Sequence, residues 1–176
     1  MKKNIVLIGM MGCGKTTTGL ELSKKLSDYK YVDIDEQIEK STQKRISDIF
    51  LQKGENFFRL IETEKIKQLC NTNEKQIIST GGGAFEKEVN RNVLQNNGIV
   101  IYLKTSPNEI YERIKLETHR PLLRKNFNTE NISKIIEQRE KNYNKADIII
   151  LTDNKNPQEI AEEIIGAIND RNYSTN

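Results

Sequence analysis

Residues 9–16 read Gly-Met-Met-Gly-Cys-Gly-Lys-Thr, a spacing that is typical of a loop holding a phosphate chain. In such a loop Gly9 and Gly14 allow backbone conformations that a Cβ would forbid, and the loop amides point at one anion. Lys15 would reach the β- and γ-phosphates, and Thr16 would ligate Mg²⁺ through its hydroxyl. The alternative is a glycine turn that happens to precede lysine and threonine.

The flanking residues supply the context that this motif requires. Residues 3–8 are mostly apolar and predict a short buried strand, and Gly19, Leu22 and Leu26 then recur at helical spacing. We interpret the thiol of Cys13 as a small filler without chemistry of its own. The loop residues that we expect around the nucleotide are Gly12, Cys13, Gly14, Lys15, Thr16 and Thr17.

A second strand, predicted over residues 29–35, ends in Asp33 and Asp35. Ligands of open α/β sheets bind beyond the carboxyl ends of the strands, and alternation along a strand would point both carboxylates the same way. One could assist Mg²⁺ through its water shell, and the other could accept hydrogen bonds from a hydroxylated substrate or take its proton. A different interpretation makes Asp35 the N-cap of a helix that begins with residues 36–39.

Two stretches further along the chain could contact a second substrate. Arg59 and Glu62 lie three residues apart on one helical face, so Glu62 could hold the guanidinium and aim it at a carboxylate. An ordinary surface ion pair of little energetic value is the alternative. Gly81, Gly82 and Gly83 follow a predicted strand and leave room for a ligand against the backbone. A flexible turn would need fewer glycines, so we favour substrate contact.

A cationic segment without a regular pattern interrupts the later helices at about residues 113–128. Helix-breaking residues combined with positive charge suit a lid that closes over phosphates and excludes water. Its histidine, His119, is interpreted as exposed and not catalytic. The cations of this segment include Arg113, Arg120, Arg124 and Lys125.

The remaining pattern predicts one α/β domain over residues 1–170, followed by a disordered tail at 171–176. Apolar runs at 76–80, 98–103 and 147–151 predict three more strands, the last of them buried on both faces. Residues 45–71 predict two helices separated near Gly54. A further helix over 132–144 contains Arg139, and an apolar stripe predicts a last helix after Pro157.

Bulk properties limit the classes of partner. The chain has 176 residues, 30% of them charged, and a net charge of +3 with both signs interleaved. This distribution gives no indication of nucleic-acid or membrane binding. No apolar run approaches the length of a membrane span, so we expect a cytoplasmic protein, and without an obvious exposed apolar stripe we expect a monomer. Cys13 and Cys70 lack the spacing of metal ligands.

Taken together, the ordered motifs resemble those of the shikimate kinase family over nearly the whole chain. The matching stretches are GMMGCGKT at 9–16, VDID at 32–35, FFRLIE at 57–62, STGGG at 79–83 and HRPLL at 119–123, with Arg139 as a further match. The resemblance implies a three-layer α/β/α fold with a five-stranded parallel sheet of order 2-3-1-4-5 and a mobile lid. It also implies transfer of the γ-phosphoryl of ATP, with one Mg²⁺, to the 3-hydroxyl of shikimate in the chorismate pathway to the aromatic amino acids.

The resemblance assigns individual roles. Asp35 would hold the substrate hydroxyls, Arg59 and Arg139 would bind the carboxylate, and Gly81, Gly82 and Gly83 would line the opposite side. Asp33 would act through the Mg²⁺ shell, and Arg120 would be the lid arginine that meets the phosphates. Arg113 would flank the adenine, with Lys155 and Pro157 on its other side. Arginine is common where Lys155 stands, so this contact departs from the family pattern. Lys15, Asp35 and Arg120 are therefore the expected catalytic residues.

Two other functions fit parts of this pattern. A gluconate-type kinase also acts on a hydroxylated carboxylate, although the FFRLIE and GGG stretches favour shikimate. A nucleotide-binding regulatory module without turnover would keep the phosphate loop but would not need Asp35 and the arginines. Whether Asp35 is a true base or only orients the hydroxyl stays open, because a loose transition state requires little base assistance.

Overall fold

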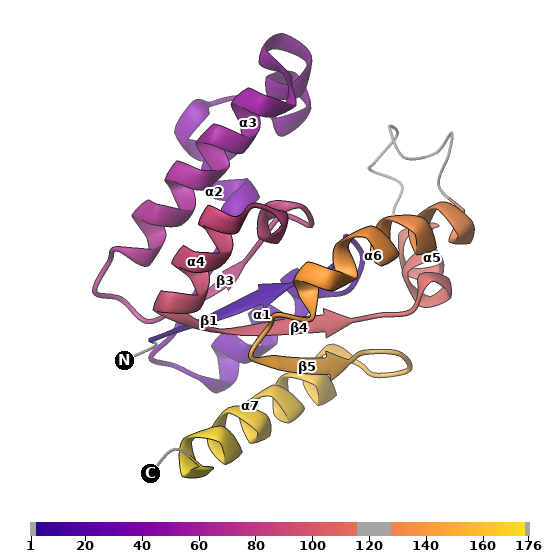
Figure 1. Cartoon of the computed structure of the whole chain (residues 1–176). Helices are drawn as coiled ribbons and strands as arrows, with labels where there is room; N and C mark the ends of the chain where they lie inside the picture. Colours follow the sequence, from indigo (N-terminus) through magenta and orange to yellow (C-terminus); the bar gives the residue numbers. More distant parts are fainter. Residues whose placement is uncertain (1–2, 116–127, 175–176) are drawn as a thin grey trace.

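Five parallel strands form the central sheet in the order β2-β3-β1-β4-β5 (Figure 1). The structure is a computed structural model that describes residues 3–115 and 128–174. The strands are β1 (Asn4–Ile8), β2 (Lys30–Asp33), β3 (Gln76–Ser79), β4 (Gly98–Lys104) and β5 (Ile148–Leu151). Their order confirms the predicted topology and places the strand before the phosphate loop at the centre of the sheet.

Alternation along β1 sends side chains into two cores. Val6 and Ile8 pack with residues of α2 (Ile34–Thr42), α3 (Ile46–Cys70) and α4 (Glu88–Asn97). Ile5 and Leu7 pack on the other face with α1 (Lys15–Lys25) and α7 (Pro157–Ser174). Figure 1 shows α7 below the sheet and α3 and α4 above it. Burial on both faces explains why β1 is a continuous apolar run.

The helix α3 is kinked at Gly54, where φ is 79° and ψ is 171°. This residue divides α3 into the two helical pieces that the sequence predicted near Gly54. A residue with a Cβ would be strained at that φ, and glycine adopts it freely. The kink therefore separates the first turns of α3 from the piece that carries Arg59 and Glu62.

Two features of the last strand and helix differ from the sequence prediction. β5 is not buried on both faces, because Ile149 and Leu151 are 45% and 60% exposed. β5 lies at the sheet edge, where Ile150 packs with α7 and its neighbours point to the uncovered side. The tail boundary at residue 170 is also wrong. α7 continues to Ser174, and Arg171 donates to the main-chain oxygen of Asp147 at 2.8 Å.

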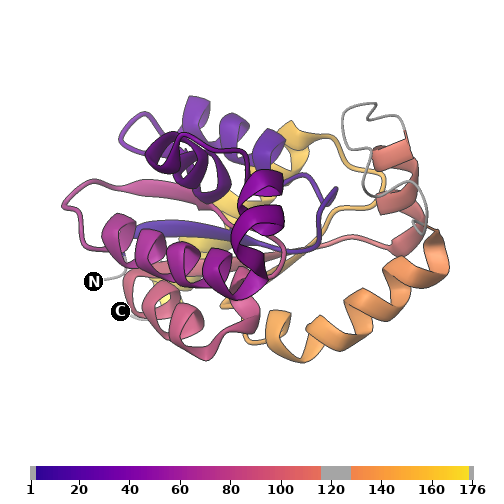
Figure 2. The same cartoon turned by 90° about the horizontal axis from the view of Figure 1, so that it is seen from above.

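The helices α5 (Pro107–Lys115) and α6 (Thr129–Tyr143) lie together at one end of the sheet, as Figure 2 shows, and a short 3₁₀ helix η1 (Ala84–Glu86) precedes α4. Residues 113–115 are the last turn of α5, which corrects the predicted start of the lid. Residues 116–127, including Arg120, His119, Arg124 and Lys125, lie outside the described residues. Among the helices in the described ranges, none is long and apolar enough to cross a membrane.

Candidate active site

A cavity of about 430 Å³ opens where the phosphate loop, β2, the loop after β3, α5 and the start of α7 meet. Its volume lies within the range of small-molecule sites. Most of the residues singled out from the sequence line it. They are Gly12, Gly14, Lys15, Thr16, Thr17, Asp33, Asp35, Gly81, Gly82, Arg113, Lys155 and Pro157. Met11, Thr18, Ser79, Thr80, Glu109 and Ile160 complete the lining.

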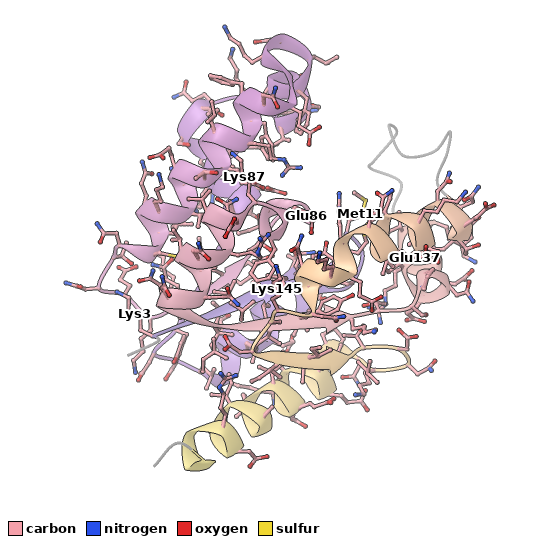
Figure 3. All side chains as sticks on the ribbon, in the orientation of Figure 1. Lys3, Met11, Glu86, Lys87, Glu137 and Lys145 are labelled. Carbon is pink, nitrogen blue, oxygen red and sulfur yellow. The ribbon has the colours of Figure 1, made fainter. Side chains whose placement is uncertain are left out.

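The backbone of the phosphate loop takes the conformations that its glycines permit. Gly9 and Gly14 have φ values of 143° and 95°, and Gly14 is the N-cap of α1. A Cβ on Gly9 would also lie 2.8 Å from the main-chain oxygen of Leu103, so the loop sits directly against β4. Met11 contributes to the apolar cluster between α5 and α6, and Figure 3 shows it beside α6.

Lys15 is held in front of the loop by main-chain oxygens. Its Nζ donates to the carbonyls of Gly9 and Met10 at 2.9 and 3.0 Å, in a position from which it faces the cavity. The Cys13 side chain is fully buried and packs in the core with Leu7 and Leu22. Its burial agrees with the filler interpretation, because only the Cys13 backbone is left to contact a nucleotide.

The two aspartates after β2 do not belong to one strand. β2 ends at Asp33, which is the N-cap of α2, and its Oδ1 accepts from the amides of Asp35 and Glu36 at 2.9 and 3.2 Å. Asp35 therefore stands in the first turn of α2. The prediction that alternation would orient both carboxylates, and the interpretation of Asp35 as the N-cap, are wrong. Both residues nevertheless line the cavity, because α2 begins at its edge.

Arg59 and Glu62 form a buried ion pair rather than a surface pair. Nη1 of Arg59 lies 2.9 Å from Oε2 of Glu62, whose side chain is 0% exposed, and Glu55 contacts the other edge of the guanidinium. Burial raises the pKa of Glu62, and the charge of Arg59 opposes this shift only in part. Burial lowers the pKa of Arg59, but the two glutamates outweigh it and the net pKa is raised.

The three glycines after β3 bring the acidic and basic groups together. A Cβ on Gly81 would lie 3.1 Å from Oδ1 of Asp35 and 3.2 Å from Oε1 of Glu62. A Cβ on Gly83 would lie 2.6 Å from Nη2 of Arg59. Side chains at these positions would therefore push against Asp35 and the Arg59–Glu62 pair.

Arg139 of α6 reaches the same loop from the opposite side. Its Nη1 donates to the main-chain oxygen of Gly82 at 3.2 Å, and the hydroxyl of Tyr143 donates to that oxygen at 2.5 Å. We call the group formed by Asp35, Arg59, residues 81–83 and Arg139 the arginine end of the site. Asp35, Gly81 and Gly82 line the cavity itself, whereas Arg59, Gly83 and Arg139 stand behind this lining. The phosphate-loop end consists of residues 9–17, Arg113, Lys155 and Pro157.

Arg113 ties the phosphate loop to two other segments. Its Nε contacts Glu109 at 3.0 Å, Nη1 donates to the main-chain oxygen of Cys13, and Nη2 donates to that of Thr152. Lys155 lines the cavity beside Arg113 and is paired with Glu163 of α7. The sequence analysis missed Glu109, although its spacing of four residues from Arg113 on one helix could have indicated it.

Sequence reasoning also missed Tyr31. This residue precedes Asp33 by two positions on β2, so the alternation of a strand could have placed both on one face. Its hydroxyl donates to Oδ2 of Asp33 at 3.4 Å. Burial raises the pKa of Tyr31, and the nearby hydroxyls of Thr16 and Ser79 oppose the shift only in part.

The fold and the cavity define a phosphoryl-transfer enzyme of the P-loop class that acts on a small molecule. A family model described as shikimate kinase matches residues 11–169. A shikimate kinase of Thermodesulfovibrio yellowstonii is 45% identical over 93% of this chain and 93% of its own length. The structure of a shikimate kinase from Acinetobacter baumannii in complex with shikimate has a TM-score of 0.88 at 32% identity, covering 96% of this chain and 94% of that one.

The chain belongs to the shikimate kinase family. It is an ATP-dependent kinase that phosphorylates an alcohol, which confirms the class predicted from the motifs. A gluconokinase from Sinorhizobium meliloti has a TM-score of 0.59 at 18% identity, covering 92% of this chain and 89% of that one, and this likeness shows the fold alone. The family match therefore favours shikimate over gluconate.

Proposed function

We propose that this chain transfers the γ-phosphoryl of ATP to the 3-hydroxyl of shikimate, giving shikimate 3-phosphate and ADP. The observation that carries the proposal is one cavity with a phosphate loop at one end and, at the other, a glycine loop that lies against Asp35, Arg139 and Arg59. A hydroxylated carboxylate needs hydrogen-bond acceptors for its hydroxyls and cations for its acid. A phosphoryl acceptor placed between the two ends would satisfy both requirements.

At the phosphate-loop end the proposed work is positioning and charge neutralisation. Lys15 would exchange its two main-chain partners for the β- and γ-phosphates. Mg²⁺ sites of kinases use one or two side chains together with phosphates and water, and Thr16 and Asp33 at the cavity wall fit that set. The ion would neutralise charge that develops on the phosphates. Arg120 would add a cation from the lid.

The adenine is proposed to lie between Arg113 and the pair Lys155 and Pro157. All three residues line the cavity, and Arg113 is fixed there by its contacts with Glu109 and two main-chain oxygens. Lys155 has Glu163 as its partner, so its charge is partly neutralised before any ligand arrives. Its aliphatic stem is therefore the part that we assign to packing against the base.

At the arginine end, Asp35 would accept the hydrogen bonds of the substrate hydroxyls. Arg59 is pre-oriented by Glu62 and Glu55, so little side-chain freedom remains to be lost when a carboxylate binds. Arg139 would turn from the carbonyl of Gly82 to the same carboxylate. Residues 81–83 would line the other side of the substrate, because they leave the space that a Cβ would fill.

The first experiment is ADP release from Mg²⁺-ATP with shikimate, with gluconate and without an acceptor. The wild type, Asp35→Asn and the control Asp28→Asn are compared. Asp28 is exposed and contacts Lys75 at 3.6 Å, away from the cavity lining. We expect turnover only with shikimate, a loss on the order of 10²-fold or more in Asp35→Asn, and no loss in the control.

Each of the other outcomes shows which assignment in the proposed function is wrong. Turnover with gluconate would keep the phosphate-loop end but remove the assignment of Arg59 and Arg139 to shikimate. ATP binding without any acceptor turnover would favour the regulatory module. The cytoplasmic location and the monomeric state stay predictions, and light scattering of the purified chain tests the second.

A further inference from the structure

The phenol of Tyr31 lies between the two side chains to which we assign the metal ion. Its hydroxyl donates to Oδ2 of Asp33 at 3.4 Å, and the hydroxyls of Thr16 and Ser79 are close enough to lower its pKa against the effect of burial. Thr16, Asp33 and Ser79 all line the cavity. The phenol thus lies where the start of α1, the end of β2 and the end of β3 meet.

The ring of Tyr31 is held in place by Gly19 of α1. A Cβ on Gly19 would lie 2.4 Å from Cε2 and 2.8 Å from Cδ2 of the ring, so the ring rests directly on the helix backbone. Glycine inside a helix costs about 1 kcal/mol relative to alanine, and here it accommodates an aromatic ring. Because Thr16 lies one turn before Gly19, the ring is held beside the turn of α1 that carries Thr16.

The carboxylate of Asp33 is oriented through both oxygens. Oδ1 accepts from the amides of Asp35 and Glu36, and Oδ2 accepts from Tyr31. The two bonds to Oδ1 are the N-cap hydrogen bonds of α2, and they would form with any N-cap aspartate. Tyr31 is therefore the contact that sets where the second oxygen points.

A hydroxyl group that ligates a metal ion needs a nearby acceptor for its hydrogen, and this need suggests a role for Tyr31. A threonine hydroxyl has one hydrogen and two lone pairs, so an oxygen that ligates a cation must direct its hydrogen elsewhere. Because the Tyr31 ring is seated against α1 one turn after Thr16, its oxygen could accept that hydrogen while its own hydrogen goes to Asp33. We propose that Tyr31 is a positioning residue, which orients the Thr16 oxygen and the Asp33 carboxylate toward the Mg²⁺ of Mg²⁺-ATP.

This inference rests on the proposed metal site, and a binding measurement tests it without turnover. The Kd of ADP is measured by calorimetry with Mg²⁺ and with a chelator, for the wild type and for Tyr31→Phe. The phenylalanine keeps the ring against Gly19 and removes only the hydroxyl. We expect the Kd in Mg²⁺ to rise about fivefold to tenfold, as for the loss of one hydrogen bond, and the Kd in chelator to stay within about twofold.

Tyr29→Phe is the matched control. Tyr29 lies just before β2 and its ring faces the ammonium of Lys75 at 5.6 Å, so it has no part in the cavity lining. Both Kd values should equal those of the wild type. A second variant, Gly19→Ala, keeps the hydroxyl but displaces the ring, and should show the same Mg²⁺-specific loss as Tyr31→Phe.

The outcomes separate the two proposals. If the wild type binds ADP equally with Mg²⁺ and with chelator, the proposed metal site is wrong and the role of Tyr31 falls with it. If Mg²⁺ strengthens binding in the wild type and equally in Tyr31→Phe, the metal site stands and the Tyr31 role is overturned. Equal weakening in both conditions, or a lower Tm without a Mg²⁺-specific effect, would also overturn it, because a packing role alone predicts that result. Should Tyr31→Phe not fold, Gly19→Ala decides in the same way.

Discussion

At the phosphate-loop end the main contacts come from one continuous stretch, residues 9–17, whereas at the arginine end they come from α2, α3, the loop after β3 and α6. Within this stretch the contacts are backbone amides and Lys15, and its shape follows from local glycine conformations, while Arg113, Lys155 and Pro157 are added from α5 and the start of α7. The second end uses side chains that meet only after the sheet and helices have packed. Glu62, for example, is fully buried and contacts Arg59 while its neighbour across Gly81 is Asp35.

The difference indicates how each end will respond to substitution. A backbone cradle is insensitive to most side-chain changes but depends on the few cations that face the phosphates. An assembled cluster depends on each partner, because removing one leaves another charge buried without compensation. We therefore expect changes at the phosphate-loop end to act mainly on kcat and changes at the arginine end to act mainly on the KM for the acceptor.

The largest effect is expected from Arg120→Ala. An arginine delivered to the transferring phosphoryl group is worth on the order of 10³–10⁵ in rate, so kcat should fall by about 10³-fold while the KM for shikimate changes little. Steady-state kinetics measure both values. Arg45→Ala, an exposed residue before α3, is the control and should keep wild-type rates. A kcat within a few-fold of the wild type would remove Arg120 from the catalytic role.

The next largest effect is expected at the arginine end, from Glu62→Gln. The amide no longer neutralises the buried guanidinium of Arg59, so the carboxylate site loses its orientation and the KM for shikimate should rise roughly 30-fold, about 2 kcal/mol. The KM for ATP should not change. Glu64→Gln is the matched control, since Glu64 is exposed and paired with Lys67 on the same helix. An unchanged KM in Glu62→Gln would show that Arg59 needs no partner.

A smaller effect is expected where the glycine loop meets Arg59. In Gly83→Ala the new methyl group displaces the guanidinium, because its Cβ would lie 2.6 Å from Nη2, and the KM for shikimate should rise about tenfold. Gly166→Ala is the control, because nothing lies within 4 Å of its Cβ position in α7. That variant should keep its kinetics and gain up to about 1 kcal/mol in the free energy of unfolding. Equal kinetics in both variants would contradict close packing at Gly83.

The smallest effect concerns pH and stability. Burial raises the folded-state pKa of Glu62 above its ordinary value of 4.5, so the folded state binds this proton more tightly than the unfolded state. Its contribution to stability is complete below pH 4.5 and is lost as pH rises through the raised pKa. The free energy of unfolding of the wild type, minus that of Glu62→Gln, should therefore decrease with pH in that window. Urea titrations at several pH values measure this difference in the free energy of unfolding. An increase of the difference with pH would mean that the pKa of Glu62 is lowered in the folded state.

Local signals were sufficient for the parts of the fold that depend on neighbouring residues. The glycine spacing and the apolar strand before it predicted the phosphate loop and α1, and the break at Gly54 was predicted from one residue. The strand order came from the family resemblance and not from periodicity, because pairing between distant strands leaves no local pattern. The structure and the family match confirm that order.

The errors in the sequence predictions have two sources. In one case two residues were equally good helix caps, and in the other the position of a strand in the sheet determined its burial. Asp33 and Asp35 are both good N-caps, and the start of α2 at Ile34 was settled by which carboxylate reached the free amides. β5 has the composition of a central strand, but its place at the edge exposes Ile149 and Leu151. Tyr31 was missed because alternation along β2 could place it beside Asp33 but could not indicate that its ring packs against Gly19 of α1.

The central position of β1 has a consequence for how the chain is made. β1 is synthesised before the other strands of the sheet, yet Ile5 pairs with Ile77 on one side and Ile99 on the other. Leu22 of α1 likewise packs in one core with Ile160 of α7. The nascent apolar strand must therefore wait for most of the chain before it is covered, a stage at which chaperones bind and misassembly competes. A fragment that ends before α7 carries the whole phosphate motif without its cover, so it would be a target for proteolysis and not a partial enzyme.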